Sequence, residues 1–376
     1  MAARAVKTNP LSPDVEQMLS AMGEAREQTL ELVGHLSADQ LEAVHSSIMS
    51  PLVWDLGHIA AYEDLWIAHR LGGEPLLRAD LAGLYDAFET PRAVRGEIEA
   101  LGPDGASDYM AEVRARTAET LARVGLGDGV ICEMVLRHEL QHSETMRQTM
   151  DIAGLLPTGE PTLEAMVEQE GWIEVPAGEF QMGAQPGAFS YDNERPRHTV
   201  AVGAFEIARR PVCNGSWMHF SEGGGYERRE WWSAEGWAWK EEYDITHHPA
   251  VAAGHPQAPV CHVSWFEADA FARAHAARLP TEAEWERAAT WSQEPEGRPA
   301  AIGCVWEWTA SHFGGYPGFL AHPYREYSEV FFGDGYRVLR GASWATHPRV
   351  ASTTFRNWDL PQRRQIFTGL RLAREA

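Results

Sequence analysis

The sequence contains few cysteines, few basic residues and no long apolar run. Its four cysteines are Cys132, Cys213, Cys261 and Cys304, spread over 376 residues. They form no C-x-x-C pair, which argues against a zinc ribbon and against a disulfide framework. This pattern is typical of a reducing compartment, and we expect a cytoplasmic location.

Basic residues are also outnumbered, because 32 Lys and Arg stand against 54 Asp and Glu, giving a formal net charge of −22. So acidic a chain is poorly suited to nucleic-acid phosphates or to anionic membranes. No stretch of eighteen apolar residues occurs, and residues 1–16 contain no apolar run typical of a signal peptide. We therefore expect small-molecule partners, with no nucleic acid and no membrane.

The remaining composition divides the chain into two parts. Residues 1–169 hold two of the fifteen tryptophans, Trp54 and Trp66. Apolar residues at helical spacing, with a capping Ser37 and polar connections, are typical of an up-and-down helical bundle. We predict its long helices over residues 13–35, 50–71, 108–124 and 128–153.

The character of the sequence changes after about Pro161, where glycine, proline and tryptophan become frequent. Strands are expected near 172–178 and 199–202, helices at 265–277 and 281–289, and the rest as loop. We therefore predict an α+β protein with domains 1–165 and 166–376, the second having a core filled by tryptophan.

The strongest local signal is His138-Glu139-Leu140-Gln141-His142. Residues four apart share a helix face, so both imidazoles can reach one metal ion. His58 on another predicted helix is the candidate third ligand, because bundles build metal sites from inward-facing side chains. The H-E-x-x-H pattern also fits a metallopeptidase with Glu139 as base. Three imidazoles suit Zn, Fe, Cu or Ni, so these residues leave the metal open.

Two groups of motifs resemble known families. Ser50-Pro51-x-x-Trp54-x-x-x-His58 and His138-Glu139-x-Gln141-His142 resemble the DinB-like domain of the ergothioneine-biosynthesis sulfoxide synthases, the EgtB family. The second half resembles the formylglycine-generating-enzyme-type domain, a C-type-lectin-like fold. The motifs that carry this second resemblance are Val175-Pro176-Ala177-Gly178, Arg278-Leu279-Pro280-Thr281-Glu282-Ala283-Glu284-Trp285-Glu286, Val305-Trp306-Glu307-Trp308 and Arg340-Gly341-x-Ser343-Trp344. The segments 316–328 and 355–367 are similar to the synthases in particular.

This resemblance implies a function and a set of site residues. Members of the family bind Fe(II) through three histidines, here His58, His138 and His142. They join a thiol to the imidazole of hercynine (trimethylhistidine) with dioxygen, and they oxidise the sulfur to a sulfoxide. By motif, Gln141 is expected to hydrogen-bond the substrate imidazole. Asn357 and Trp358 are expected to hold the carboxylate and the trimethylammonium group, which suits an aromatic face.

The thiol substrate implied by the resemblance is γ-glutamylcysteine. Its two carboxylates suit arginine forks and its ammonium group suits a carboxylate. The matching residues are Arg92, Arg95, Asp359 and Arg363. The family also uses a tyrosine as proton donor, for which Tyr316 and Tyr324 are the candidates, and we prefer Tyr316.

One departure from the family is the short stretch between Ala289 and Val305, in which Cys304 replaces an expected Asn or Asp. Alternative hypotheses are a synthase that uses a selenium donor, a DinB-like zinc-dependent thiol S-transferase or hydrolase, and a binding module with a structural metal. A formylglycine-generating activity is disfavoured, because no cysteine follows Cys304 to complete the expected pair.

Overall fold

The computed structural model describes residues 12–161, 163–166, 170–249, 254–292, 298–300 and 302–376. The chain forms two compact units, Met1–Thr158 and Gly159–Ala376. The predicted domain division after residue 165 lies just inside the second unit and stays a prediction. Within the described ranges, no helix combines the length and the apolar character that crossing a bilayer requires.

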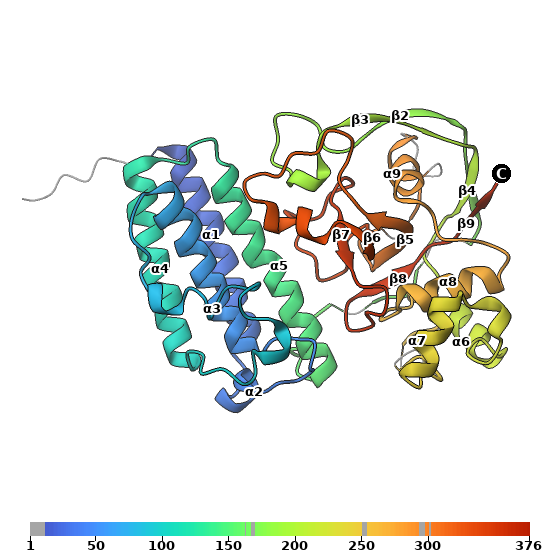
Figure 1. Ribbon diagram of the computed structural model, residues 1–376, viewed down its shortest axis with the longest axis horizontal. Coiled ribbons are helices and arrows are strands. Elements are labelled where there is room, and N and C mark those ends of the chain that lie inside the picture. The colour runs from blue at the N-terminus through green and yellow to red at the C-terminus, as the bar shows by residue number, and fades with distance from the viewer. Residues whose placement is uncertain (1–11, 162, 167–169, 250–253, 293–297, 301) are drawn as a thin grey trace, which may run out of the picture. The chain divides into compact units, whose positions relative to one another are not determined.

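The first unit is helical. Its helices are α1 (Pro13–Val33), α2 (Ala38–Glu42), α3 (Leu52–Glu63), α4 (Pro103–Val124) and α5 (Val130–Ala153) (Figure 1). A π-helical segment, η1 (Asp64–Leu71), continues α3, and the turns η2 (Ala79–Leu81) and η3 (Arg92–Val94) precede α4. The four predicted long helices are confirmed. Helix α4 begins before the predicted residue 108, because Pro103 is suited to a first helical position.

Local signals in the sequence set where these helices begin and end. The Ser37 hydroxyl accepts a hydrogen bond from the Gln40 amide, and the Gln40 side chain accepts one from the Ser37 amide. This capping box starts α2 as predicted. Helix α5 ends at Gly154, whose φ of 68° is a left-handed conformation that glycine adopts without a Cβ clash.

The core of the first unit lies between the four long helices. Apolar side chains recur every three or four residues on each helix, so that one face of each is buried. The buried cluster includes Leu32 and Val33 of α1, Leu52, Leu56 and Ile59 of α3, Met110 and Val113 of α4, and Met146 and Met150 of α5. This packing fixes the inner faces of α3 and α5, the two helices that carry the candidate metal ligands.

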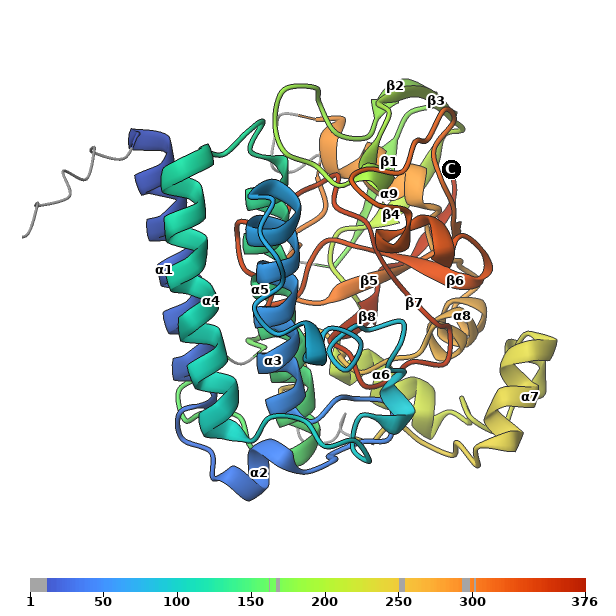
Figure 2. The same ribbon diagram turned by 60° about the vertical axis from the view of Figure 1, so that its left-hand side comes forward.

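The second unit contains three small sheets (Figure 2). Strands β1 (Trp172–Val175), β4 (Phe205–Ala208) and β9 (Ala373–Glu375) form one, and β2 (Gly178–Met182) pairs with β3 (His198–Val202). The third has the order β7-β6-β5-β8, formed by β7 (Asn357–Asp359), β6 (Gly333–Arg340), β5 (Trp306–Phe313) and β8 (Thr368–Leu370). The β5–β8 pair is parallel and the other pairs are antiparallel.

Helices α6 (Asn214–Glu222), α7 (Ala234–Glu242), α8 (Trp265–Ala274) and α9 (Glu282–Thr290) complete this unit, with the short turns η4 (Asp192–Glu194), η5 (Arg229–Trp231), η8 (Arg325–Tyr327) and η9 (Glu329–Phe331). The prediction of loop outside the recognised strands and helices was wrong for α6, α7 and the strands β4 to β9. The first four residues of β5 are all buried, including the polar Glu307 and Thr309, so the burial of this strand does not follow its apolar-polar alternation.

Tryptophan fills the second core as predicted. Trp217, Trp285 and Trp308 are fully buried. The Trp285 indole donates to the Glu307 carboxylate (2.7 Å) and the Trp308 indole donates to the Val263 carbonyl (2.7 Å). These bonds satisfy polar atoms that burial would otherwise leave unpaired.

Candidate metal centre

Three histidines from two helices converge inside the first unit. His58 lies on α3, and His138 and His142 lie one turn apart on α5. One nitrogen from each lies within 4.8 Å of the other two, and the His58 and His138 Nε2 atoms are 3.2 Å apart. In the described part of the chain, no other group of three His, Cys, Asp or Glu side chains comes this close together.

The ring orientation of His58 is set by a backbone group. Its Nδ1 lies 2.6 Å from the Tyr85 carbonyl oxygen, which can only accept, so Nδ1 carries the proton. The lone pair of a neutral His58 is therefore on Nε2, the atom that faces His138. A histidine that donates its other ring N–H in this way is typical of metal ligands.

Burial favours the neutral form of two of these imidazoles. Burial lowers the pKa of His58 and of His138 well below the ordinary value, and the neighbouring His142 lowers both further. A histidine must be unprotonated to bind a metal ion. Three neutral nitrogen donors fit a divalent first-row transition metal, and the donor set alone does not choose among iron, zinc, copper and nickel.

Aromatic rings from α3 pack against two of the ligands. Trp54, four residues before His58, stacks on it with ring centroids 4.9 Å apart, and Tyr62, four residues after, stacks on His138 at 3.7 Å. We did not predict either contact. The signal was present, because residues 54, 58 and 62 recur at helical spacing along one face.

Glu139, the acid of the H-E-x-x-H pattern, does not serve the metal centre. Its carboxylate is buried and pairs with Arg26 (2.7 Å) and Arg114 (3.2 Å), which also pair with Glu63. One helical step of about 100° separates its direction from that of His138. This ion network contradicts the peptidase alternative, which needs Glu139 as a base beside the metal.

The predicted thiol-binding arginines of the first unit differ in their surroundings. Arg92 is exposed in η3, whereas Arg95 is buried. The Arg95 guanidinium donates to Ser50 Oγ (2.8 Å), to the Thr90 carbonyl (2.9 Å) and to the Ala87 carbonyl (3.2 Å). It also lies 3.7 Å above the Trp54 ring and lines a hollow of about 270 Å³.

Gln141 lies on α5 immediately before His142 and is half-buried. Its backbone carbonyl accepts a hydrogen bond from Thr145 (3.3 Å). Its predicted contact with the substrate imidazole stays a prediction.

In the second unit, Trp358 lies in an aromatic group, which consists of Phe313, Tyr327, Phe331 and Trp358. The Trp358 ring stacks on Phe313 with centroids 4.1 Å apart and meets Tyr327 edge-on at 5.9 Å. It is half-buried on β7 beside Asn357, whose side-chain oxygen accepts from the Trp358 amide (2.9 Å). Such a group has the aromatic faces that favour a quaternary ammonium ion.

Asp359 and Arg363 follow in the same segment and lie 3.3 Å apart as an ion pair. Arg363 is buried, while Asp359 is half-buried. The structure therefore brings these two predicted residues together. Their predicted contact with a γ-glutamylcysteine substrate stays a prediction.

The two candidate tyrosines have different environments. Tyr316 is buried in a cluster with Phe180 and Met182, and its hydroxyl donates to Glu282 (3.3 Å). Burial and the Glu282 charge raise its pKa above the ordinary value. Tyr324 is half-buried and lies edge-on to Tyr327 of the aromatic group (6.2 Å). Tyr324 therefore borders the aromatic group, while Tyr316 lies buried beside Glu282, and the choice between them as proton donor stays a prediction.

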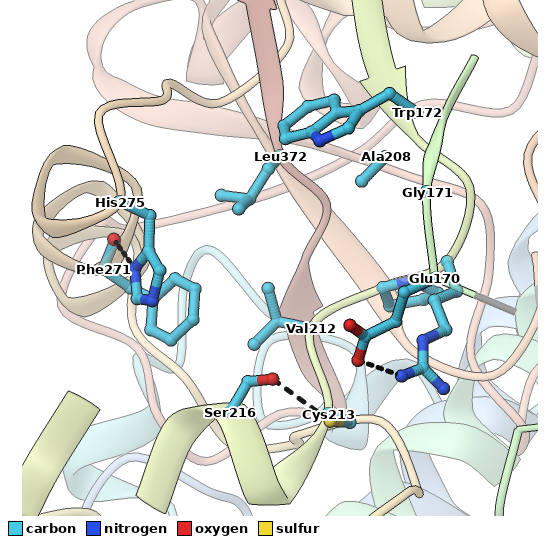
Figure 3. Close-up of a pocket in the computed structure, with 12 residues that line it drawn as sticks. Glu170, Gly171, Trp172, Ala208, Val212, Cys213, Ser216, Phe271, His275 and Leu372 are labelled. Carbon is cyan, nitrogen blue, oxygen red and sulfur yellow. Dashed lines mark hydrogen bonds and ion pairs between the residues drawn. The ribbon is translucent and has the colours of Figure 1, made fainter. Parts of the chain in front are cut away.

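A separate hollow of about 170 Å³ in the second unit has apolar walls that include Trp172, Val212, Phe271 and Leu372 (Figure 3). Cys213 and Ser216 lie at one side, with Sγ and Oγ 3.4 Å apart. None of the predicted site residues lines it. The shortened segment at 290–304 lies partly outside the described residues, and Cys304 within it is half-buried.

Comparisons with known proteins agree with this two-part organisation. Residues 21–146 match the DinB superfamily, and residues 159–298 and 297–376 match the sulfatase-modifying factor enzyme 1-like domain. The chain is 39% identical to the hercynine oxygenase of Mycobacterium tuberculosis, over 95% of this chain and 98% of that protein.

Two further relatives extend the comparison. The hercynine oxygenase of Mycolicibacterium smegmatis is 38% identical over 95% of this chain and 98% of its own length. The ergothioneine biosynthesis protein 1 of Schizosaccharomyces pombe is 25% identical over 90% of this chain and 53% of its own length. Because the mycobacterial identity extends over nearly the whole chain, this protein belongs to the hercynine oxygenase family, the ergothioneine-biosynthesis sulfoxide synthases.

Proposed function

We propose that this protein is an iron(II)- and dioxygen-dependent sulfoxide synthase that joins γ-glutamylcysteine to hercynine. The observation that carries the proposal is the convergence of His58, His138 and His142 in a chain of this family. The reaction breaks the imidazole C2–H bond and the thiol S–H bond, and it forms one C–S bond and one S–O bond. These two oxidations release four electrons, which reduce dioxygen to the sulfoxide oxygen and one water.

Iron(II) held by His58, His138 and His142 would supply open coordination positions for the thiol and for dioxygen, and would favour the thiolate form. The chain supplies the orientation of these ligands. The Tyr85 carbonyl fixes the His58 ring, while Trp54 and Tyr62 pack on the flat faces of His58 and His138. Rigid support of this kind preserves the geometry that a two-substrate reaction needs.

Hercynine carries a trimethylammonium group, a carboxylate and an imidazole, and one candidate residue suits each. The Trp358 face suits the cation. Asn357 uses its side-chain oxygen internally, so its amide N–H groups suit the carboxylate. Gln141 suits the imidazole nitrogen, because an amide can both donate and accept a hydrogen bond.

The thiol donor is assigned to Arg92, Arg95, Asp359 and Arg363. Arg92 is exposed and Arg95 lines a hollow, so each can meet a carboxylate. The Asp359–Arg363 ion pair presents both charges that an amino-acid end group requires. A thiol with one carboxylate fewer, such as cysteine, is therefore expected to be a poorer substrate.

Proton donation is assigned to Tyr324. Its ring contacts Tyr327, which packs on Trp358, whereas the Tyr316 hydroxyl is directed at Glu282 inside the core. A general acid must lie within reach of the reacting group. Tyr324 is half-buried and can be reached from outside the core, whereas Tyr316 is buried.

The test is oxygen uptake by anaerobically Fe(II)-loaded protein, with hercynine and γ-glutamylcysteine added separately and then together. We expect sustained uptake with both substrates. Uptake that requires neither hercynine nor a thiol would contradict the proposal, as would full iron loading with no uptake. Zinc-loaded protein is the matched control, because zinc has no redox chemistry and should consume no oxygen.

A further inference from the structure

Asp55 of α3 is a buried acid with no assigned role. It is 1% exposed and lies three residues before His58. Its Oδ1 lies 3.3 Å from His142 Nδ1, but the two atoms are not aligned as a hydrogen bond. Within the described residues, Asp55 Oδ2 and His142 Nδ1 are both buried without a hydrogen-bond partner.

Other buried acids near Asp55 have partners, so its unpaired carboxylate oxygen is unusual for the first unit. Glu63, at the end of α3, pairs with Arg26 and with Arg114, each at 2.8 Å. Asp64 pairs with Arg116 (3.0 Å) and accepts the Leu77 amide (2.8 Å). Buried charges are normally paired in this way, because leaving water without compensation is costly.

The nearest arginine in this region does not supply the missing bond. The Arg95 guanidinium gives its hydrogen bonds to Ser50, Thr90 and Ala87. Burial lowers the pKa of Arg95 to about 10, and the charge of Asp55 opposes that shift. Arg95 therefore acts on Asp55 through electrostatic attraction, and no direct ion pair joins the two.

A metal ion bound to His142 through Nε2 would leave the proton on Nδ1, so that Nδ1–H could donate to the Asp55 carboxylate. Metal-binding histidines commonly donate their second ring N–H to a carboxylate, which fixes the tautomer and raises the basicity of the ligand nitrogen. For His58, the Tyr85 carbonyl accepts the corresponding ring N–H. Three neutral imidazoles also leave the site of a divalent ion with a net charge of about +2. One nearby carboxylate lowers this net charge by one.

We propose that Asp55 is a positioning residue for the metal centre, which orients His142 through Nδ1–H and balances part of the charge of the ion. This inference rests on the proposed function only in that the three histidines bind a metal. It assigns no contact between Asp55 and the substrates.

The experiment compares full-length wild type with Asp55→Asn, which keeps the shape and removes the charge. The matched control is Asp64→Asn, because Asp64 is also 1% exposed and follows α3 directly, but it contacts Arg116 instead of a histidine. Fe(II) and Co(II) dissociation constants are measured anaerobically by competition with a chelator. Thermal unfolding of the metal-free proteins is measured in parallel.

We expect Asp55→Asn to weaken metal binding about 10–100-fold, while the metal-free variant unfolds no earlier than wild type, since an unpaired buried charge has been removed. Asp64→Asn should do the reverse, with unchanged metal affinity and earlier unfolding. Equal metal affinity of wild type and Asp55→Asn would overturn the inference. So would earlier unfolding of metal-free Asp55→Asn with unchanged affinity, which is the result of a merely structural role.

A spectroscopic readout separates orientation from charge. In the Zn(II)-loaded wild type, nitrogen NMR should show His142 protonated at Nδ1, and the signal should shift in Asp55→Asn. Protonation at Nε2 in the wild type would overturn the inference. Failure of the wild type to bind any of the three metals would instead defeat the proposed function, so the two failures are distinguishable.

Discussion

In the first unit, the candidate metal ligands project from two long helices, whereas in the second unit the candidate hercynine residues lie on the three-residue strand β7. Helix α3 also supplies Trp54 and Tyr62, which pack on the histidines. Strand β7 supplies no such support, and Trp358 is held by Phe313 and Tyr327, which are distant in sequence. The metal centre is therefore supported mainly by nearby residues of its own helices, and the aromatic group by contacts across the chain.

The two sites should accordingly respond separately to substitution. The largest effect is expected for His138→Gln, which removes a candidate ligand. Loss of an orienting residue weakens metal binding about 10–100-fold, so loss of a ligand should exceed about 100-fold and reduce product to background. Iron content and oxygen uptake measure this effect. His35→Gln is the control, because His35 is exposed and contacts the Leu155 carbonyl. Retained iron binding in His138→Gln would show that His138 is not a metal ligand and that the metal centre does not lie on α3 and α5 as described.

Within the second unit, the two tyrosines should differ. Tyr324→Phe should slow product formation about 100-fold, the lower end of what a general acid contributes, without loss of stability. Tyr316→Phe should instead cost about 1 kcal/mol of unfolding free energy, because the hydrogen bond to Glu282 is lost. Turnover rates and urea denaturation of both variants measure the difference. The opposite pattern would return the role of proton donor to Tyr316.

A smaller effect is expected for Trp358→Ala. A desolvated cation–π contact contributes about 2 kcal/mol, which corresponds to roughly 30-fold weaker hercynine binding. Calorimetric titration with hercynine measures this loss of affinity. The hercynine affinity of Trp358→Phe should lie between that of Trp358→Ala and that of wild type. Iron content should not change. If Trp358→Ala also lost its iron, the two sites would not be independent.

The prediction with the least effect on activity is a pH dependence of stability that arises in the second unit. Burial lowers the pKa of His248 to about 4 from 6.5, although Glu267 opposes the shift, and Arg364 and His262 add to it. The unfolded chain therefore binds a proton more readily. The contribution of His248 to stability is complete above about pH 6.5 and declines as the pH falls toward 4, by up to about 3 kcal/mol.

His248→Gln should flatten this dependence between pH 6.5 and 4 and leave the metal affinity unchanged. Denaturant unfolding at several pH values measures it. Identical pH profiles for wild type and variant would show that His248 is not held neutral in the fold.

The same contrast explains how far the sequence was informative. His138 and His142 could be predicted as a pair of ligands because helical spacing alone places them on one face. The role of Asp55 could not be predicted in this way, because its partner His142 is far along the chain, although the apolar residues on both sides of Asp55 were a sign of burial. Glu139 was misleading for a related reason, since Arg26 and Arg114, which claim its carboxylate, lie on other helices.

In the second unit, the residues around Trp358 could be assigned only through resemblance to a family. Strands β5 and β6 escaped prediction. Trp306-Glu307-Trp308-Thr309 at the start of β5 alternates apolar and polar residues, but all four are buried, and the partners that satisfy Glu307 and Thr309 are Arg371 and the Val338 carbonyl, far along the chain. The candidate tyrosines were separated only by their packing, as the hydroxyl of Tyr316 meets Glu282 across 34 residues of sequence. Tertiary contacts of this kind carry no local signal.

The most direct test of the central claim is the mass spectrum of the product formed under ¹⁸O₂ by Fe(II)-loaded protein with hercynine and γ-glutamylcysteine. We predict a single species that contains both substrates and one ¹⁸O atom, with no label when ¹⁸O is supplied as water. A joined product without ¹⁸O, or no joined product despite one iron per chain, would contradict the assignment.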